Sequence, residues 1–322
     1  MKDVWDLIRR TKFGPPVLAL ALAIALFFIG GLARPGFANP SQAVNIVRLA
    51  AFLGIMSAGQ TLVILSGGEG IDLSVGAVVT LSAILVFRIV DGDNSMVLPA
   101  LAVGLGAGAV TGLLNGLGII YLGIPPLVMT LGMTGVVQGV VLVVTQGQLI
   151  GDSAPIMATL ISRPLILGIP GVVIVWVLLG IGMWALLQRT AYGKQVFAVG
   201  VNRITARLSG VRVPLVVVAT YTISGLLAAF GGFILLGFTQ SVFLNLGNRY
   251  LFPSIAAVVV GGTVLAGGKG SYWGTMSGAL VLTLMTSLLT ALQLQEAFRL
   301  MILGTTLLIL ISVYGRQRAL RQ

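Results

Sequence analysis

The stretch VILSGGEG at residues 63–70 recurs as TVLAGGKG at residues 263–270, so the two copies are offset by 200 residues. Six of the eight positions are identical or conservatively exchanged, and in each copy a run of glycines ends one apolar stretch shortly before another begins. This shared context predicts an internal duplication. The expected half-repeats cover about residues 43–187 and 214–314.

The composition on either side of these copies is that of a membrane protein. Of the 322 residues, 57% are hydrophobic and only 8% are charged, and 44 are glycine. A soluble chain carries roughly 25% charged residues, so this one lacks the polar side chains to cover a surface in water. Apolar segments rich in small residues are typical of closely packed transmembrane helices. The expected fold is therefore all-α: a polytopic membrane protein forming a single domain over residues 1–322, with the lipid bilayer as its surroundings.

The residue types that are missing exclude several chemistries. The chain has no cysteine and no histidine, so disulfides, Cys/His metal sites, thiol nucleophiles and imidazole bases are ruled out. No metal and no cofactor are expected. The net charge of +11 does not indicate nucleic acid here, because the basic residues fall in loops and tails.

Ten apolar stretches predict about ten transmembrane helices, since one span takes roughly 20 residues. The first is longer than the core of a secretory signal and lacks a small-x-small cleavage site, so we expect an uncleaved first span. The stretches are residues 17–33, 49–65, 75–90, 97–122, 126–144, 165–187, 214–238, 251–265, 272–294 and 298–314.

The basic residues predict the orientation of the chain. An N-terminus in the cytoplasm, with alternating sides, places 13 of the 19 basic residues inside, as the positive-inside rule requires. Basic tails at both ends also require an even number of crossings, so both termini are expected in the cytoplasm. The inside set is Lys2, Arg9, Arg10, Lys12, Arg189, Lys194, Arg203, Arg207, Arg212, Lys269, Arg316, Arg318 and Arg321.

In this topology both glycine-rich copies lie on the inner side, which predicts parallel repeats, a common construction in transporters. Glycine runs break a membrane helix and expose backbone groups, which are tolerated only against protein or a water-filled cavity. Helix breaks at corresponding positions therefore indicate the transport path. The break residues are Gly67, Gly68, Glu69, Gly267, Gly268 and Lys269, and a facing pair of Glu69 and Lys269 is one arrangement that they allow.

Two interpretations remain open for Asp72 and Ser74, which precede the stretch from residue 75. Either side chain can cap the free amides of a helix beginning there. Alternatively, a carboxylate at membrane depth is costly and usually serves transport, so Glu69 or Asp72 can line the path.

Further small and polar residues lie along the apolar stretches. Gly104, Gly108, Gly112 and Gly116 recur every fourth residue and form one ridge, and the spacing recurs at 270, 274 and 278. Such ridges pack helices closely, either inside one subunit or between subunits. Asn115 beside the ridge is either a packing group or a path residue, and Thr130 and Gln138 offer weak hydrogen bonds to a solute.

The loop at 189–213 is the longest polar inside loop, and it predicts a short amphipathic helix. Asn202 can cap this helix and Gly210 can end it. Arg203 and Arg207 then share one face while Ile204 and Leu208 share another. Such a helix can insert into a groove of a partner protein, although a basic loop that only fixes the topology has the same composition.

Five segments resemble the permease subunits of ribose-type ABC importers, in the order that this family shows. The resemblance covers essentially the whole chain, with one departure: SGGEGIDLS carries an additional Glu69-Gly70 pair. The segments are GIDLSVG (70–76), GIPPLVMTLGM (123–133), TQGQLI (145–150), TAYGKQVFAVGVNRITARLSGV (190–211) and IAAVVVGGTVLAGGKGSYWGTMSGAL (255–280).

The resemblance implies a bacterial inner-membrane permease that works with three partners. These are a second permease copy or paralogue, a cytoplasmic ATPase with two nucleotide-binding cassettes, and a periplasmic solute-binding protein. It assigns ATPase coupling to the 189–213 loop. Apart from the resemblance, the expected path residues are the break residues together with Asp72, Ser74, Asn115, Pro125, Pro126 and Thr130. The expected coupling residues are Tyr192, Gly193, Asn202, Arg203, Ala206, Arg207, Leu208 and Gly210.

The chain itself is not expected to be an enzyme, because it contains no GxxxxGK[ST] phosphate-binding loop. The expected cargo is a neutral sugar or sugar-like solute, and a nucleoside, the cargo of a sister branch, is the alternative. An ion-coupled secondary transporter would instead use Glu69 or Asp72 as its coupling carboxylate. An intramembrane aspartyl protease would need a second membrane aspartate facing Asp72, whereas Asp91, Asp93 and Asp152 fall in outside loops.

Overall fold

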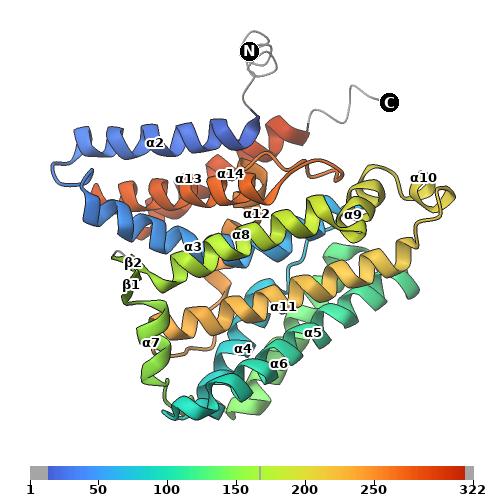
Figure 1. Cartoon of the computed structure of the whole chain (residues 1–322), viewed down its shortest axis with the longest axis horizontal. Helices are drawn as coiled ribbons and strands as arrows, with labels where there is room; N and C mark the ends of the chain where they lie inside the picture. The colour runs from blue at the N-terminus through green and yellow to red at the C-terminus, as the bar shows by residue number, and fades with distance from the viewer. Residues whose placement is uncertain (1–13, 167, 316–322) are drawn as a thin grey trace, which may run out of the picture.

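The computed structural model describes residues 14–166 and 168–315, and over these residues the chain is a bundle of helices with one small β-hairpin (Figure 1). The charged tails that entered the topology prediction lie outside the described residues. Strands β1 (Pro164–Ile166) and β2 (Ile169–Pro170) pair antiparallel, with Pro164 opposite Pro170. The helices are α2 (Pro15–Ala33), α3 (Pro40–Leu65), α4 (Val75–Val90), η1 (Asn94–Met96), α5 (Val97–Tyr121), α6 (Pro126–Thr145), α7 (Pro155–Ile161), α8 (Gly171–Arg189), α9 (Ala191–Val201), α10 (Arg203–Leu208), α11 (Val213–Thr239), η2 (Asn248–Tyr250), α12 (Leu251–Val260), α13 (Tyr272–Ala291) and α14 (Glu296–Gly315).

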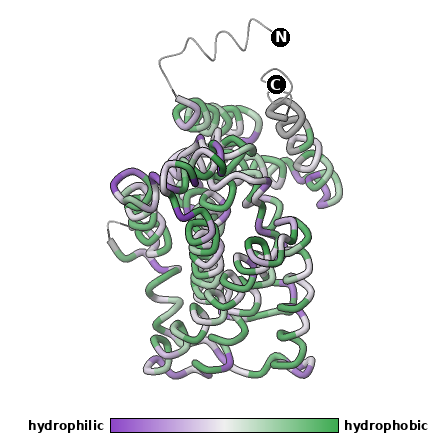
Figure 2. The backbone as a smooth tube through the Cα atoms, turned by 90° about the vertical axis from the view of Figure 1, so that its right-hand side faces the viewer, coloured by the Kyte–Doolittle hydropathy of each residue, from purple (hydrophilic) through white to green (hydrophobic). Residues whose placement is uncertain are grey.

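The predicted all-α membrane fold is confirmed, and every predicted apolar stretch contains a helix. Within the described residues, seven helices are long and apolar enough to cross a membrane. Figure 2 shows hydrophobic residues along the helices and many of the hydrophilic ones in the connections between them. The seven are Pro15–Ala33, Pro40–Leu65, Asn94–Tyr121, Pro126–Thr145, Gly171–Arg189, Val213–Thr239 and Tyr272–Ala291.

The count of ten spans is not established: two of the predicted spans form short helices, and the predicted stretch 298–314 lies in α14, which is not among the seven. Helix α4 has 16 residues and α12 has only 10, whereas a span takes roughly 20. The predicted stretch 251–265 stays helical only to Val260, since Gly261 and Gly262 follow and Gly262 has φ +87°. In the predicted stretch 165–187, the first residues belong to strands β1 and β2, and the helix begins at Gly171.

Helix α3 lies at the centre of the bundle, where it carries the first glycine break. It begins at Pro40 after Asn39, whose side chain accepts a hydrogen bond from Gln42 N at 2.7 Å. Of its most apolar window, 83% is buried inside the protein, against 17% for α2. Most of α3 after its first turns therefore packs against protein, whereas most of α2 is exposed.

The glycine ridge of α5 packs against α11 within the same chain. A Cβ on Gly108 would overlap the Gly225 carbonyl oxygen, and a Cβ on Gly112 would overlap that of Tyr221. A Cβ on Gly116 would lie 2.7 Å from Val218 Cα. The two backbones touch where side chains would otherwise separate them. The interpretation of the ridge as packing inside one subunit is thus confirmed for these positions.

The connections from 189 to 213 form two helices at one end of the bundle, at the right of Figure 1. Helix α9 follows α8 almost directly, and the short α10 precedes α11. The β-hairpin and α7 lie at the opposite side of the same view. The α9–α10 end is therefore distinct from the end that carries the hairpin.

Candidate functional site

The two glycine breaks, 200 residues apart in sequence, touch each other. Gly268 N donates a hydrogen bond to the carbonyl oxygen of Leu65, the last residue of α3, at 2.9 Å. A Cβ on Gly267 would meet the backbone of Gly67, with Gly67 N at 2.7 Å. Gly67 and Gly267 have φ of +67° and +91°, which favours glycine at both positions.

The end of α9 completes this contact. A Cβ on Gly200 would overlap Leu65 O and would lie 2.5 Å from Gly268 N. A Cβ on Gly67 would in turn lie 2.8 Å from Gly200 O. Three chain segments therefore meet backbone against backbone, and we call this contact the glycine junction, which consists of Gly67, Gly68, Gly200, Gly267 and Gly268.

Asp72 is buried between the first break and α11. Its side chain is 1% exposed, and its carboxylate accepts hydrogen bonds from Ser74 N at 3.0 Å and Ser74 Oγ at 2.6 Å. Ser224 Oγ of α11 donates to the other carboxylate oxygen at 2.9 Å. These donors satisfy a group whose burial without partners would be costly. These contacts place Asp72 just before α4, whose N-cap residue is Ser74, but no side-chain cap hydrogen bond is present at this helix start.

The chain between the breaks and α4 is held by polar groups of three other helices. Asn115 Nδ2 of α5 donates to Ser74 Oγ at 2.9 Å, while Asn115 Oδ1 is buried without a partner. Thr130 Oγ1 of α6 accepts from Leu73 N at 3.0 Å. Gln60 of α3, in the orientation that satisfies both groups, donates to Asp72 O at 3.3 Å and accepts from Asp72 N at 3.2 Å.

The predicted path residues divide into two groups. Gly67, Asp72, Ser74, Asn115 and Thr130 are buried, and the contacts above bring them together. Pro125 and Pro126 cap and begin α6, and Glu69 and Lys269 are both exposed. Gln60, Ser224 and Tyr221 were not predicted from the sequence. The buried hydroxyl of Tyr221 has no hydrogen-bond partner among the residues that the structure describes. The roles of the predicted path residues in transport stay predictions.

Helix α9 is anchored to the bundle at its first turn. Thr190 caps it, accepting from Gly193 N at 3.0 Å, and a Cβ on Gly193 would overlap carbonyl oxygens of α8. Tyr192 Oη and Thr220 Oγ1 of α11 share a hydrogen bond of 2.9 Å. Burial raises the pKa of Tyr192 to about 12, so the phenol is neutral around pH 7.

The short helix predicted after Asn202 is present as α10. Asn202 Oδ1 accepts from Ile204 N at 2.9 Å and from Thr205 N at 3.0 Å, and Gly210 has φ +83°. Ala206 is 4% exposed, whereas Ile204 is 73% and Leu208 84% exposed. Helix α10 therefore presents two apolar side chains outward, and none of the residues that the structure describes covers them.

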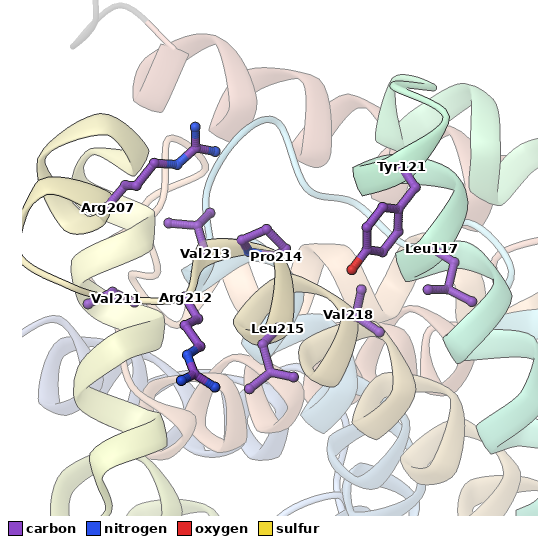
Figure 3. Close-up of a pocket in the computed structure, with 9 residues that line it drawn as sticks. All are labelled: Leu117, Tyr121, Arg207, Val211, Arg212, Val213, Pro214, Leu215 and Val218. Atoms are coloured by element: carbon purple, nitrogen blue, oxygen red, sulfur yellow. The ribbon is translucent and has the colours of Figure 1, made fainter.

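A groove of about 640 Å³ lies between the end of α5, the start of α11 and the connection that follows α10 (Figure 3). It is mostly apolar, with two arginines on its wall. The lining residues are Leu117, Tyr121, Arg207, Val211, Arg212, Val213, Pro214, Leu215 and Val218.

Apolar helices around glycine breaks and irregular backbone, with a projecting surface helix, are the architecture of a membrane permease. Comparisons with known proteins agree. Residues 42–311 match the family described as the permease component of a branched-chain amino acid transport system. The chain belongs to this family and is the permease subunit of an ABC importer.

Several curated permeases are similar over most of their length. The ribose import permease of Bacillus subtilis is 38% identical over 96% of this chain and 94% of its own. The fructose import permease of Rhizobium meliloti is 34% identical over 92% of this chain and 84% of its own. The autoinducer 2 import system permease of Shigella flexneri is 30% identical, with 94% and 87% covered. No solved structure matches the chain.

Proposed function

We propose that the chain imports a neutral sugar or sugar-like solute across a bacterial inner membrane, driven by a separate ATPase with two nucleotide-binding cassettes. The relatives named for ribose and fructose support the class of cargo. The buried polar groups around Asp72 and Ser74 are mostly neutral hydroxyls and amides. Such groups suit weak hydrogen bonds to an uncharged polyhydroxylated solute better than they suit a strongly ionic one.

The outward-facing pair on α10 is the single observation that carries ATPase coupling. Ile204 and Leu208 are 73% and 84% exposed on a well-capped helix, and large apolar side chains bared together mark interaction sites. A helix of this kind binds a groove of a partner through its apolar face. The ATPase would therefore bind the apolar face of α10, while α9 connects α10 to the bundle.

The same end of the chain would face the cytoplasm. Arg189, Lys194, Arg207 and Arg212 lie on or beside α9 and α10, and an excess of basic residues in short loops marks the inner side. An even number of crossings then returns the C-terminus to the cytoplasm with the N-terminus. A binding protein in the periplasm would deliver the solute at the opposite end, where the β-hairpin lies.

The path would run beside the two breaks, and a second permease copy or paralogue would complete it. The short helix α4 follows the first break, whereas the short helix α12 precedes the second. The half-repeats over about 43–187 and 214–314 therefore stay a prediction from the two glycine-rich copies. Irregular backbone at membrane depth is stable only against protein or an aqueous cavity. The contacts between the breaks and α9 support a path that lies close to the proposed coupling helix.

A reconstituted complex tests both the cargo and the partners. The chain is purified with the ATPase and the solute-binding protein encoded beside it, and ATP hydrolysis is measured with D-ribose, D-fructose or uridine added. We expect the ATPase to co-purify and a sugar to stimulate hydrolysis through the binding protein. Stimulation by uridine alone would assign the nucleoside alternative, and failure of the ATPase to co-purify would contradict the coupling assignment.

A further inference from the structure

The side chain of Arg203 points toward the bundle, unlike the exposed side chains of Ile204 and Leu208 on the same helix. Arg203 is the first residue of α10 and half-buried, and its Nη2 donates to the carbonyl oxygen of Gly67 at 3.4 Å. A Cβ on Gly68 would overlap the guanidinium group. The guanidinium therefore occupies the space beside Gly68 that a side chain would fill at any residue other than glycine.

The glycine junction links this arginine to the second break as well. Gly200, three residues before Arg203, contacts Leu65 and Gly268, and Gly268 N is bonded to Leu65 O at 2.9 Å. Val201 packs against Gly268, because a Cβ there would lie 2.9 Å from Val201 N. No side chain separates the three backbones, so little can be compressed or rotated to absorb a displacement of α9.

We propose that the glycine junction moves as one body, so that a displacement of α10 reaches both helix breaks together, and that Arg203 is the positioning residue that keeps the first break attached to α9. This inference rests on the proposed ATPase coupling but assigns Arg203 to the inner contact rather than to the docking surface. The contact between Arg203 and the first break is weaker than the backbone contacts of the junction. Arg203 makes one long hydrogen bond to the break, and its Nε is buried without a partner.

The chain has no cysteine, so a single nitroxide label can be placed on either break without removing native thiols. Glu69→Cys and Lys269→Cys carry exposed labels on the first and second break, respectively. The labelled chain is reconstituted in lipid nanodiscs with its ATPase. Label mobility is compared between the nucleotide-free complex and the complex trapped with ATP and vanadate. We expect both labels to respond to nucleotide in the otherwise wild-type chain.

Arg203→Ala should leave the ATPase bound but reduce the response of the label at 69 by roughly threefold or more, the scale of a lost coupling contact. Arg203→Lys, which keeps a cationic donor, should retain more of the response than Arg203→Ala. Arg212→Ala is the matched control. It removes the same charge from an exposed residue of the neighbouring connection and should respond as the wild type.

The outcomes separate the two claims. If the wild-type chain does not retain the ATPase, the proposed coupling fails and this inference falls with it. If the ATPase is retained and Arg203→Ala responds like the wild type at residue 69, only the role of Arg203 is overturned. If, in the wild-type background, the label at residue 269 responds to nucleotide but the label at residue 69 does not, the breaks do not move together and the inference is wrong.

Discussion

The hydroxyl of Ser224 on α11 donates a hydrogen bond of 2.9 Å to the carboxylate of Asp72, which lies between the first glycine break and α4. This bond spans 152 residues of sequence and fixes the irregular backbone after α3 to a long apolar helix. Ser74 occupies the other carboxylate oxygen. The hydrogen bonds of Asp72 to Ser74 and Ser224 thus hold the start of α4 against α11.

This geometry predicts that Asp72→Asn is tolerated. The amide oxygen of an asparagine can still accept from Ser74, and its NH₂ group can donate to the Ser224 hydroxyl. Asp72→Ala should destabilise the protein by about 1–3 kcal/mol, because it leaves buried donors without acceptors. Thermal unfolding in detergent, together with transport by the reconstituted complex, checks both variants. A stable Asp72→Asn protein that no longer transports would show that the charge itself serves the path.

The ridge of α5 predicts a large difference between two glycine substitutions. Gly112→Leu should destabilise the bundle by about 1–3 kcal/mol or more, because even a Cβ would overlap the Tyr221 carbonyl oxygen. Gly132→Leu on α6 is the matched control, since a Cβ there meets nothing within 4 Å. Melting temperatures of the two purified variants test this. Equal stability would show that α5 and α11 do not pack closely at Gly112.

The exposed apolar pair on α10 predicts that Leu208→Asp weakens ATPase binding by roughly tenfold or more, because an unpaired carboxylate would be buried in the interface. Membrane insertion should be unchanged, since Leu208 is 84% exposed. Ile150→Asp is a suitable control, because Ile150 is also exposed, at 61%, and lies in the connection after α6. Co-purification of the ATPase measures the effect. Normal ATPase binding by Leu208→Asp would remove α10 from the interface.

The phenol of Tyr192 predicts a stability change confined to alkaline pH. Burial raises the pKa of Tyr192 from 10.0 to about 12, so its neutral form is favoured in the folded chain. The buried neutral phenol contributes fully to the free energy of unfolding below about pH 10, and this contribution is lost as the pH rises toward about 12. Tyr192→Phe lacks this titration and also loses the bond to Thr220, at a cost of about 1 kcal/mol. The difference in melting temperature between the wild type and Tyr192→Phe should therefore shrink above about pH 10. A difference that stays constant up to pH 12 would contradict this account.

Local patterns in the sequence predicted the features that depend on neighbouring residues. The break at Gly67 and Gly68, the cap at Asn202 and the ridge around Gly112 follow from residue spacing and backbone preference. Each is present where the pattern placed it. Local physics is sufficient in these cases because the residues that determine the structure are close together in the sequence.

Contacts between distant segments were not predictable in the same way. Neither Ser224 nor Gln60 differs in its sequence context from other polar residues in apolar helices, and only the fold brings both to Asp72. The end of α12 at Val260 was also missed, because hydropathy continues beyond the point at which Gly261 and Gly262 end the helix. The three-way contact at Gly200 likewise arises only when α9 packs against both breaks.

The central claim is that this chain is a passive permease opened by a separate ATPase through α10, and solute uptake into proteoliposomes tests it most directly. Uptake of D-ribose is measured for the chain alone under a proton or sodium gradient, and for the complex with ATPase, binding protein and ATP. The account predicts uptake only by the complete complex with ATP. Gradient-driven uptake by the chain alone would contradict it.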